Sequence, residues 1–146
     1  MNKHILIGVF LVMQGLLAYS QQMERCDLLR RILSDSTVVH ELLFNKEGMN
    51  PLIIKQTKRS VENCIQIDTL GRLIKYQTMG VDSFYAEARK DRKENCSVLY
   101  ISELEDIKNG EKKVSVADPC ANAVVDLYFK LKKGKLLFIR SVLGPM

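Results

Sequence analysis

The stretch Val124–Val142, VVDLYFKLKKGKLLFIRSV, decides the fold class of this chain. Apolar residues are frequent on both sides of Lys133-Gly134, a pair suited to a two-residue turn. The pattern predicts a β-hairpin with strands Val124–Lys132 and Lys135–Val142. The expected cross-strand neighbours are Leu131 and Leu136, Phe129 and Phe138, and Tyr128 and Ile139. Because both faces carry apolar groups, we expect the hairpin to lie centrally in a sheet or to be covered on both sides.

Several shorter stretches upstream of this hairpin predict further strands. They are Leu52–Ile54, Cys64–Asp68, Arg72–Met79, Ser97–Ser102 and Lys113–Val116. Asn109-Gly110 lies before the last of these and is the strongest local turn signal, because both residues tolerate positive φ. Phe84–Glu94 is typical of either a short helix or an exposed excursion between strands.

The clearest helical pattern lies at residues 23–34, MERCDLLRRILS. Its apolar residues recur at steps of three and four, as on one buried face of an amphipathic helix. Ser34-Asp35-Ser36 can end this helix and cap a second one. Residues 37–44 fit both a short helix and an alternating strand, and we favour the helix. The predicted fold class is α+β, with an N-terminal amphipathic helix or helix pair packed on an antiparallel β-sheet of about five or six strands.

The first twenty residues have the pattern of a secretion signal. Lys3 provides the basic start, Ile5–Val12 the apolar run, and Ala18-Tyr19-Ser20 the small residues before a cut. An N-terminal membrane anchor is the alternative, but Gln14-Gly15 interrupts the apolar run. We therefore expect residues 1–20 to be a signal peptide, cleaved near Ser20, and residues 21–146 to be a single domain without a transmembrane segment. Removal of Lys3 changes the net charge of the chain from +5 to +4.

Four cysteines remain after the expected cleavage, an even number that favours disulfides in a small secreted or periplasmic protein. Three pairings are open. We favour Cys26 with Cys64 and Cys96 with Cys120, because each pair joins segments that follow each other closely in the chain. Zinc binding needs clustered ligands such as Cys-x-x-Cys, and the wide spacing here predicts no metal site.

Few side chains are suited to catalysis. His40 is the one histidine outside the expected signal, so a histidine-dependent mechanism has to use it. The acidic groups are Glu103 with Glu105 and Asp106, and Asp82 with Glu87; they are more typical of solvated edges than of an acid–base pair. The glycines stand singly and form no phosphate-binding loop. We expect no catalytic residues, no metal and no cofactor.

Two basic clusters, Arg89–Lys93 and Lys130–Lys135, can meet an anionic surface. Lysines at a hairpin tip also protect strand edges against aggregation, and this second interpretation is favoured. No specific nucleic-acid binding is predicted.

The sequence therefore predicts a small exported, non-enzymatic binding or accessory protein, whose partner is an unknown protein or small ligand. The expected working surface is a sheet face or edge near Tyr76, Tyr100 and Tyr128, because exposed aromatic residues among polar ones favour recognition. The same tyrosines can instead belong to the core. A minor hydrolase or transferase that uses His40 or an acidic pair, and a purely structural envelope component, are the alternatives.

Overall fold

A computed structural model provides the fold of the chain. It describes residues 26–46, 48–49, 51–56, 64, 70–79, 84–90 and 96–146. The predicted signal peptide lies outside the described residues, and so does the predicted strand Cys64–Asp68 except for its first residue. Within the described ranges, none of the helices combines the length and the apolar character that a membrane span requires.

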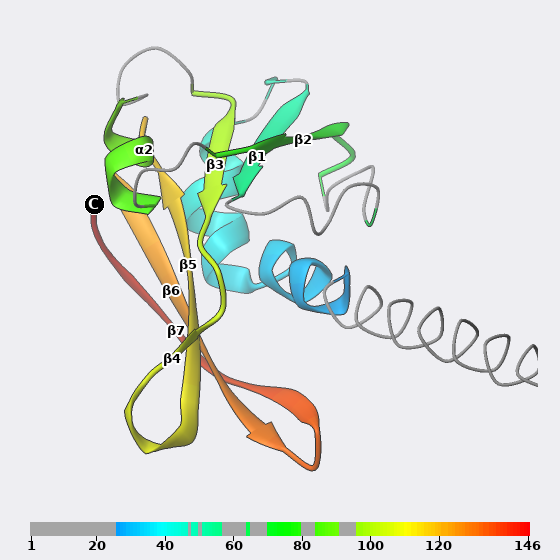
Figure 1. Cartoon of the computed structure of the whole chain (residues 1–146). Coiled ribbons are helices and arrows are strands. Elements are labelled where there is room, and N and C mark those ends of the chain that lie inside the picture. The colour runs from blue at the N-terminus through cyan, green and yellow to red at the C-terminus, as the bar shows by residue number, and fades with distance from the viewer. Residues whose placement is uncertain are drawn as a thin grey trace, which may run out of the picture.

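A mixed sheet forms the centre of the molecule, with strand order β2-β1-β3-β5-β6-β7 and with β4 paired to β5 alone (Figure 1). The strands are β1 (Leu52–Gln56), β2 (Ile74–Thr78), β3 (Val98–Ile101), β4 (Glu105–Asp106), β5 (Glu111–Asp118), β6 (Ala123–Lys132) and β7 (Lys135–Pro145). Strands therefore dominate the part of the chain that the structure describes.

The prediction of an antiparallel sheet is wrong for two of the six strand pairings among the described residues. Strand β1 pairs in parallel with both β2 and β3, while β4–β7 are antiparallel. Parallel neighbours need a crossover connection of a dozen or more residues. Residues 79–97 connect β2 to β3, two parallel strands that flank β1, and they contain the helix α2 (Phe84–Lys90). This helix was one of two options left open by the sequence, and its presence makes the parallel arrangement feasible.

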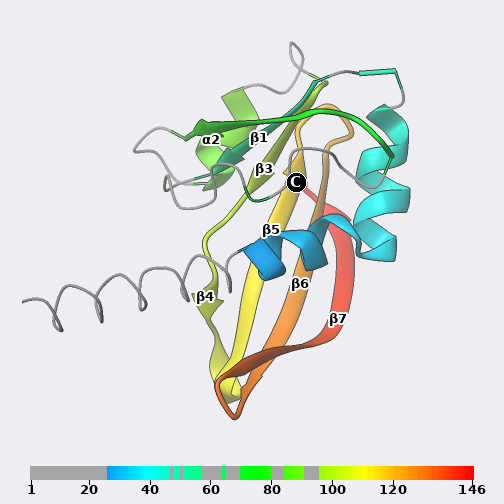
Figure 2. The same cartoon turned by 90° about the vertical axis from the view of Figure 1, so that its right-hand side faces the viewer.

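Helical segments cover the opposite face of the sheet from α2 (Figures 1 and 2). Residues 26–33 are helical, followed by the π-helix η1 (Val38–Leu43) and the 3₁₀ helix η2 (Phe44–Lys46). The segment 37–44 is thus helical, as favoured. Asp35 caps it, because its Oδ1 accepts hydrogen bonds from the backbone N–H groups of Thr37 and Val38, at 3.0 and 3.3 Å.

Two apolar clusters, one on each face of the sheet, form the core. The larger cluster joins the helical segments to the sheet and includes Leu29, Ile32, Leu42, Val116 and Phe129. The smaller one places Ala88 of α2 against the other face, with Tyr100 and Val124 among its members. Alternate residues of the central strands point to opposite faces, so both faces contribute to the core.

The C-terminal hairpin has the predicted turn, with Lys133 at φ 51° and Gly134 at φ 74°. Leu131 pairs with Leu136 and Phe129 with Phe138, as expected. The expected pairing of Tyr128 with Ile139 is wrong, because a register shift at this point places Tyr128 opposite Arg140. A β-bulge of this kind inserts one extra residue into a strand, and alternation alone does not reveal it.

Two disulfides join distant parts of this fold. Cys26 bonds to Cys64 and Cys96 to Cys120, each with a Cα–Cα distance of 5.1 Å, and these are the pairs that the spacing favoured. Disulfides of this kind form and persist in oxidising environments such as the periplasm or the extracellular space.

Candidate binding surface

The three tyrosines proposed from the sequence do not form a common surface. Tyr100 is fully buried in the smaller core cluster, and its hydroxyl accepts a hydrogen bond from Lys55 Nζ at 3.1 Å. Tyr76 packs against the larger cluster, on the other face of the sheet. Tyr128 is half-buried, with the Arg140 guanidinium 4.1 Å from its ring centroid. Tyr76 lies on the edge strand β2, and Tyr128 lies on β6 next to the other edge strand, β7.

His40 is placed for solvent contact. Its side chain is 82% exposed on η1, and its Nδ1 lies 3.1 Å from Glu41 Oε1, on the next residue in the chain. Its ring also lies 6.4 Å from that of Phe44. Among the described residues, no nucleophile is held against this imidazole by an observed hydrogen bond.

Two of the acidic residues considered above, Asp106 and Glu87, pair with lysines. Asp106 Oδ1 lies 2.5 Å from Lys112 Nζ on the adjacent strand, and Glu87 Oε1 lies 3.2 Å from Lys90 Nζ within α2. Asp82 falls outside the described residues. Within the described part of the chain, no group of three or more His, Cys, Asp or Glu side chains is arranged to hold a metal ion.

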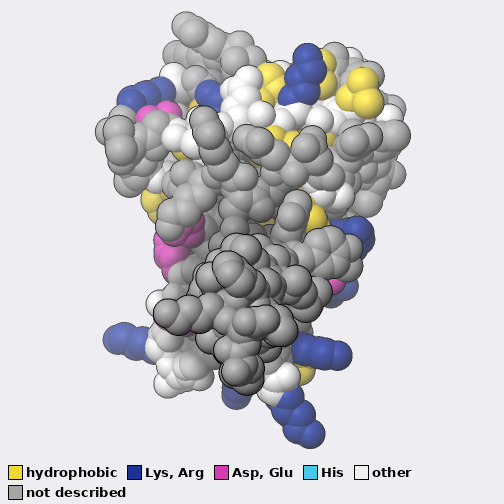
Figure 3. Space-filling view, turned by 45° about the vertical axis from the view of Figure 1, so that its right-hand side comes forward, with side chains coloured by type: hydrophobic (Ala, Val, Ile, Leu, Met, Phe, Trp, Pro, Cys, Tyr) yellow, Lys and Arg dark blue, Asp and Glu magenta, His cyan; other side chains and the backbone are white. Residues whose placement is uncertain are grey.

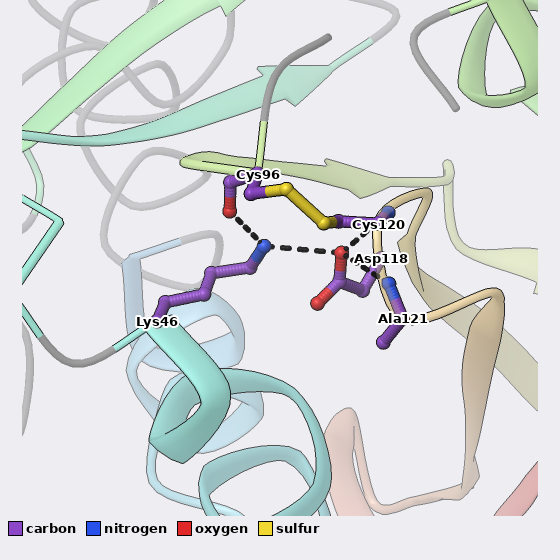
Figure 4. The surroundings of a disulfide bond; sticks show 5 residues. All are labelled: Lys46, Cys96, Asp118, Cys120 and Ala121. Carbon is purple, nitrogen blue, oxygen red and sulfur yellow. Dashed lines mark hydrogen bonds and ion pairs between the residues drawn. A yellow bond between two sulfur atoms is a disulfide. The ribbon is translucent and has the colours of Figure 1, made fainter. Parts of the chain in front are cut away.

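A buried ion pair that the sequence did not predict lies beside the second disulfide (Figure 4). Lys46 Nζ lies 3.0 Å from Asp118 Oδ1, and both side chains are 1% exposed. Lys46 also donates a hydrogen bond to the backbone carbonyl of Cys96. Asp118 Oδ1 accepts from the backbone N–H groups of Cys120 and Ala121, at 2.9 and 3.3 Å. The pair thus links both cysteines of one disulfide to η2.

Burial lowers the pKa of Lys46 below its ordinary value of 10.5, because desolvation penalises the ammonium ion. The nearby Asp118 carboxylate opposes this effect, and Arg72 adds to it. Arg72 is also buried, and its Nη1 donates to the backbone carbonyls of Leu43 and Lys46, at 3.2 and 2.8 Å. These cations hold η2 in place, a structural role.

A small hollow of about 170 Å³ lies next to this cluster, lined by Phe44, Gly48, Leu70 and Arg72. Phe44 and Leu70 are exposed, while Arg72 is directed toward the backbone of η1 and η2. A hollow of this size is smaller than the usual binding cavity for a drug-sized ligand.

Several exposed apolar side chains follow β7, the last strand of the sheet. We call this the β7 surface, and its exposed apolar residues are Leu137, Ile139, Val142 and Leu143. Strand β7 pairs with β6 on one side, and no described strand pairs with its other side. The hairpin was expected to be central or covered on both sides, and that expectation is wrong for β7. Sequence alternation cannot distinguish an apolar edge strand from an apolar central one.

Side-chain contacts fix the position of the β7 surface. Arg140 stacks on Tyr128, and its Nη2 lies 3.1 Å from Glu111 Oε2. On the opposite face, Ser141 Oγ lies 2.8 Å from Thr37 Oγ1. The edge is therefore held against β5, β6 and the helical layer.

Next to the β7 surface lies a basic hairpin end, which we call the lysine tip: Lys130, Lys132, Lys133 and Lys135. All four side chains are exposed. Lys132 and Lys135 lie directly opposite each other in the register of β6 and β7, an unfavourable arrangement of like charges. Figure 3 shows Lys and Arg side chains projecting from this end of the molecule.

Comparison with protein-family models, with curated proteins and with solved structures finds no match for this chain.

Proposed function

We propose that the protein is an exported, non-enzymatic binding module whose β7 edge accepts an extended segment of a partner protein. The observation that carries this proposal is the combination of length and exposure in one edge strand. Strand β7 has 11 residues, and four large apolar side chains along it are exposed. An unpaired strand edge offers backbone N–H and C=O groups to another strand, and its side chains add specificity.

The opposite edge of the sheet supports the choice of β7. Strand β2 has five residues, and its exposed side chains are the polar Lys75, Gln77 and Thr78. Short edges with lysine and other polar residues are the ones that proteins protect against further pairing. Strand β7 has a lysine at its start, a bulge at Ile139 and Pro145 at its end. Between these features, Ser141–Gly144 is an uncharged segment on which a partner strand can begin to pair.

Export is part of the same proposal. The pattern of residues 1–20 and the two disulfides both favour a secreted or periplasmic location after cleavage near Ser20. Recovery of a mature chain that begins at Gln21 from the exported fraction would support it.

Selection of peptides tests the binding proposal. The oxidised protein is used as bait to select binders from displayed random decapeptides. Hydrogen–deuterium exchange of the protein, with and without a selected peptide, then maps the binding site. We expect peptides with alternating apolar residues, which slow exchange in residues 139–144. The variant V142K/L143K, with two charges on the edge, should bind them at least tenfold more weakly.

The matched control is Leu73→Lys, because Leu73 is exposed to a similar extent but precedes β2 at the other edge of the sheet. This variant should bind the selected peptides as the original protein does. Exchange protection confined to β2, or unchanged binding by V142K/L143K, would contradict the proposal.

A further inference from the structure

The lysine tip has more positive charge than edge protection requires. Of its four lysines, Lys135 alone lies on the edge strand. Lys130 lies on β6 where this strand pairs with both β5 and β7, whereas Lys132 lies beyond the end of the β5–β6 pairing and pairs only with β7. A lysine on an internal strand does not block an edge. The explanation favoured from the sequence therefore accounts for Lys132 and Lys135 but leaves Lys130 and Lys133 unexplained.

Neighbouring carboxylates do not neutralise the lysine tip. Glu111 lies directly opposite Lys130 in the register of β5 and β6, yet its carboxylate contacts Arg140 instead. Asp106 pairs with Lys112, and Asp126 with Lys113 at 3.6 Å. In the part of the chain that the structure describes, no acidic side chain forms an ion pair with Lys130, Lys132, Lys133 or Lys135. Lys108, on the turn between β4 and β5, adds charge at the same end of the sheet.

Exposed leucines lie among these lysines on both faces of the hairpin. Leu131 is 51% exposed and pairs with Leu136, while Leu137 is 48% exposed and pairs with Lys130. In both views of the fold, the ends of the β4–β5 and β6–β7 hairpins project beyond the helices (Figures 1 and 2). The helices therefore do not prevent this end of the sheet from contacting a flat surface.

We infer that the lysine tip docks on a bilayer that contains anionic phospholipid, with Leu131 and Leu137 at the depth of the upper acyl chains. Clustered lysines are attracted to anionic headgroups, and apolar side chains among them gain from leaving water. Long lysine side chains can extend back to the headgroups while their stems stay in apolar surroundings. A soluble polyanion would use the lysines but would give the two leucines no apolar environment. This inference does not depend on strand addition at β7.

Co-sedimentation with vesicles tests the inference on the full, oxidised chain. We expect binding to vesicles of phosphatidylcholine and phosphatidylglycerol at 7:3 in 0.15 M NaCl, and at least tenfold weaker binding to pure phosphatidylcholine. Each surface lysine near an anionic bilayer changes affinity about fivefold, so K132Q/K135Q should bind about 30-fold more weakly. The matched control K75Q/K90Q removes the same charge from β2 and α2 and should stay within twofold of the original.

The role of the leucines separates a bilayer from a polyanion. The variant L131Q/L137Q should lose vesicle binding more than tenfold but elute from heparin at unchanged salt. Since the chain has no Trp, Leu137→Trp supplies a single reporter, whose emission should shift to the blue on anionic vesicles. Leu73→Trp should show no shift. Three results would overturn the inference. They are absence of vesicle binding at 0.15 M NaCl, a loss of vesicle binding in K75Q/K90Q equal to that in K132Q/K135Q, and unchanged vesicle binding by L131Q/L137Q.

Discussion

Lys46 and Asp118 form a fully buried ion pair. Two charges that are 1% exposed have lost nearly all of their hydration, and their mutual attraction offsets that cost when every remaining hydrogen-bonding group is also satisfied. The carbonyl of Cys96 and the N–H groups of Cys120 and Ala121 supply such hydrogen bonds. Loss of one partner leaves the other charge buried without compensation.

We expect Lys46→Met to lower the free energy of unfolding by about 3–5 kcal/mol, measured by urea denaturation, because the Asp118 carboxylate stays buried without its cation. The double variant K46M/D118N should be more stable than K46M, since the amide oxygen can still accept from Cys120 and Ala121. A loss below 1 kcal/mol for K46M would show that the pair contributes little.

The lowered pKa of Lys46 also predicts how stability changes with pH. In the unfolded chain this lysine titrates near 10.5, whereas in the folded protein it releases its proton at lower pH. Between these two pKa values the unfolded state binds more protons, so the free energy of unfolding should rise as pH increases toward 10.5.

Urea denaturation between pH 8 and 10.5 checks this sign. The difference in the free energy of unfolding between the original protein and Lys46→Met should increase over this range. A constant or decreasing difference would mean that the folded state does not favour neutral Lys46.

Among the elements, the C-terminal hairpin shows both the success and the limit of sequence reasoning. Turn chemistry at Lys133-Gly134 is local, and it gave the correct partners for Leu131 and Phe129. The bulge at Ile139 depends on how the edge twists against β6, so alternation could not place Tyr128 opposite Arg140. The exposure of β7 depends on its position at the edge of the sheet, which is set by the strand order of the whole sheet.

The hairpin turn contains a residue in an unfavourable conformation. Lys133 has φ 51°, in the left-handed region that Asn tolerates better than Lys. We expect Lys133→Asn to raise the free energy of unfolding by about 0.5–1 kcal/mol, measured by urea denaturation. Lys133→Ala removes the same charge but leaves the backbone strain in place. An equal rise in the free energy of unfolding for this variant would show that the effect comes from the charge.

The two disulfides differ in what their removal exposes. From the length of the closed loop, Cys26–Cys64 should contribute about 4 kcal/mol and Cys96–Cys120 about 3.5 kcal/mol. The backbone of Cys96 and Cys120 also binds the Lys46–Asp118 pair. We therefore expect C96A/C120A to lower the free energy of unfolding more than C26A/C64A, despite the shorter loop. If urea denaturation shows a larger loss for C26A/C64A, the Cys96–Cys120 disulfide does not stabilise the protein through the ion pair.

At the scale of the molecule, composition and periodicity predicted an α+β chain but not the mixed sheet. Residues 84–90 were correctly considered as a helix, yet a helix between two strands can serve as a crossover or as an excursion. Which role it takes depends on whether β1 lies between β2 and β3, a long-range pairing with no local signal. The buried Lys46–Asp118 pair escaped prediction for the same reason, since its partners lie on separate elements.

The mixed sheet has a consequence for the order of folding. Strands β5, β6 and β7 are joined by short turns. Strand β1, in contrast, pairs with β2 and β3, which both follow later in the chain; Ile53, for example, pairs with Val98. Contacts between residues close in the chain form sooner than distant ones. We expect pulse-labelled amides of β6 to be protected before those of β1. The first strand to be synthesised would then be the last to find its partners, and until then its apolar residues would be accessible to chaperones.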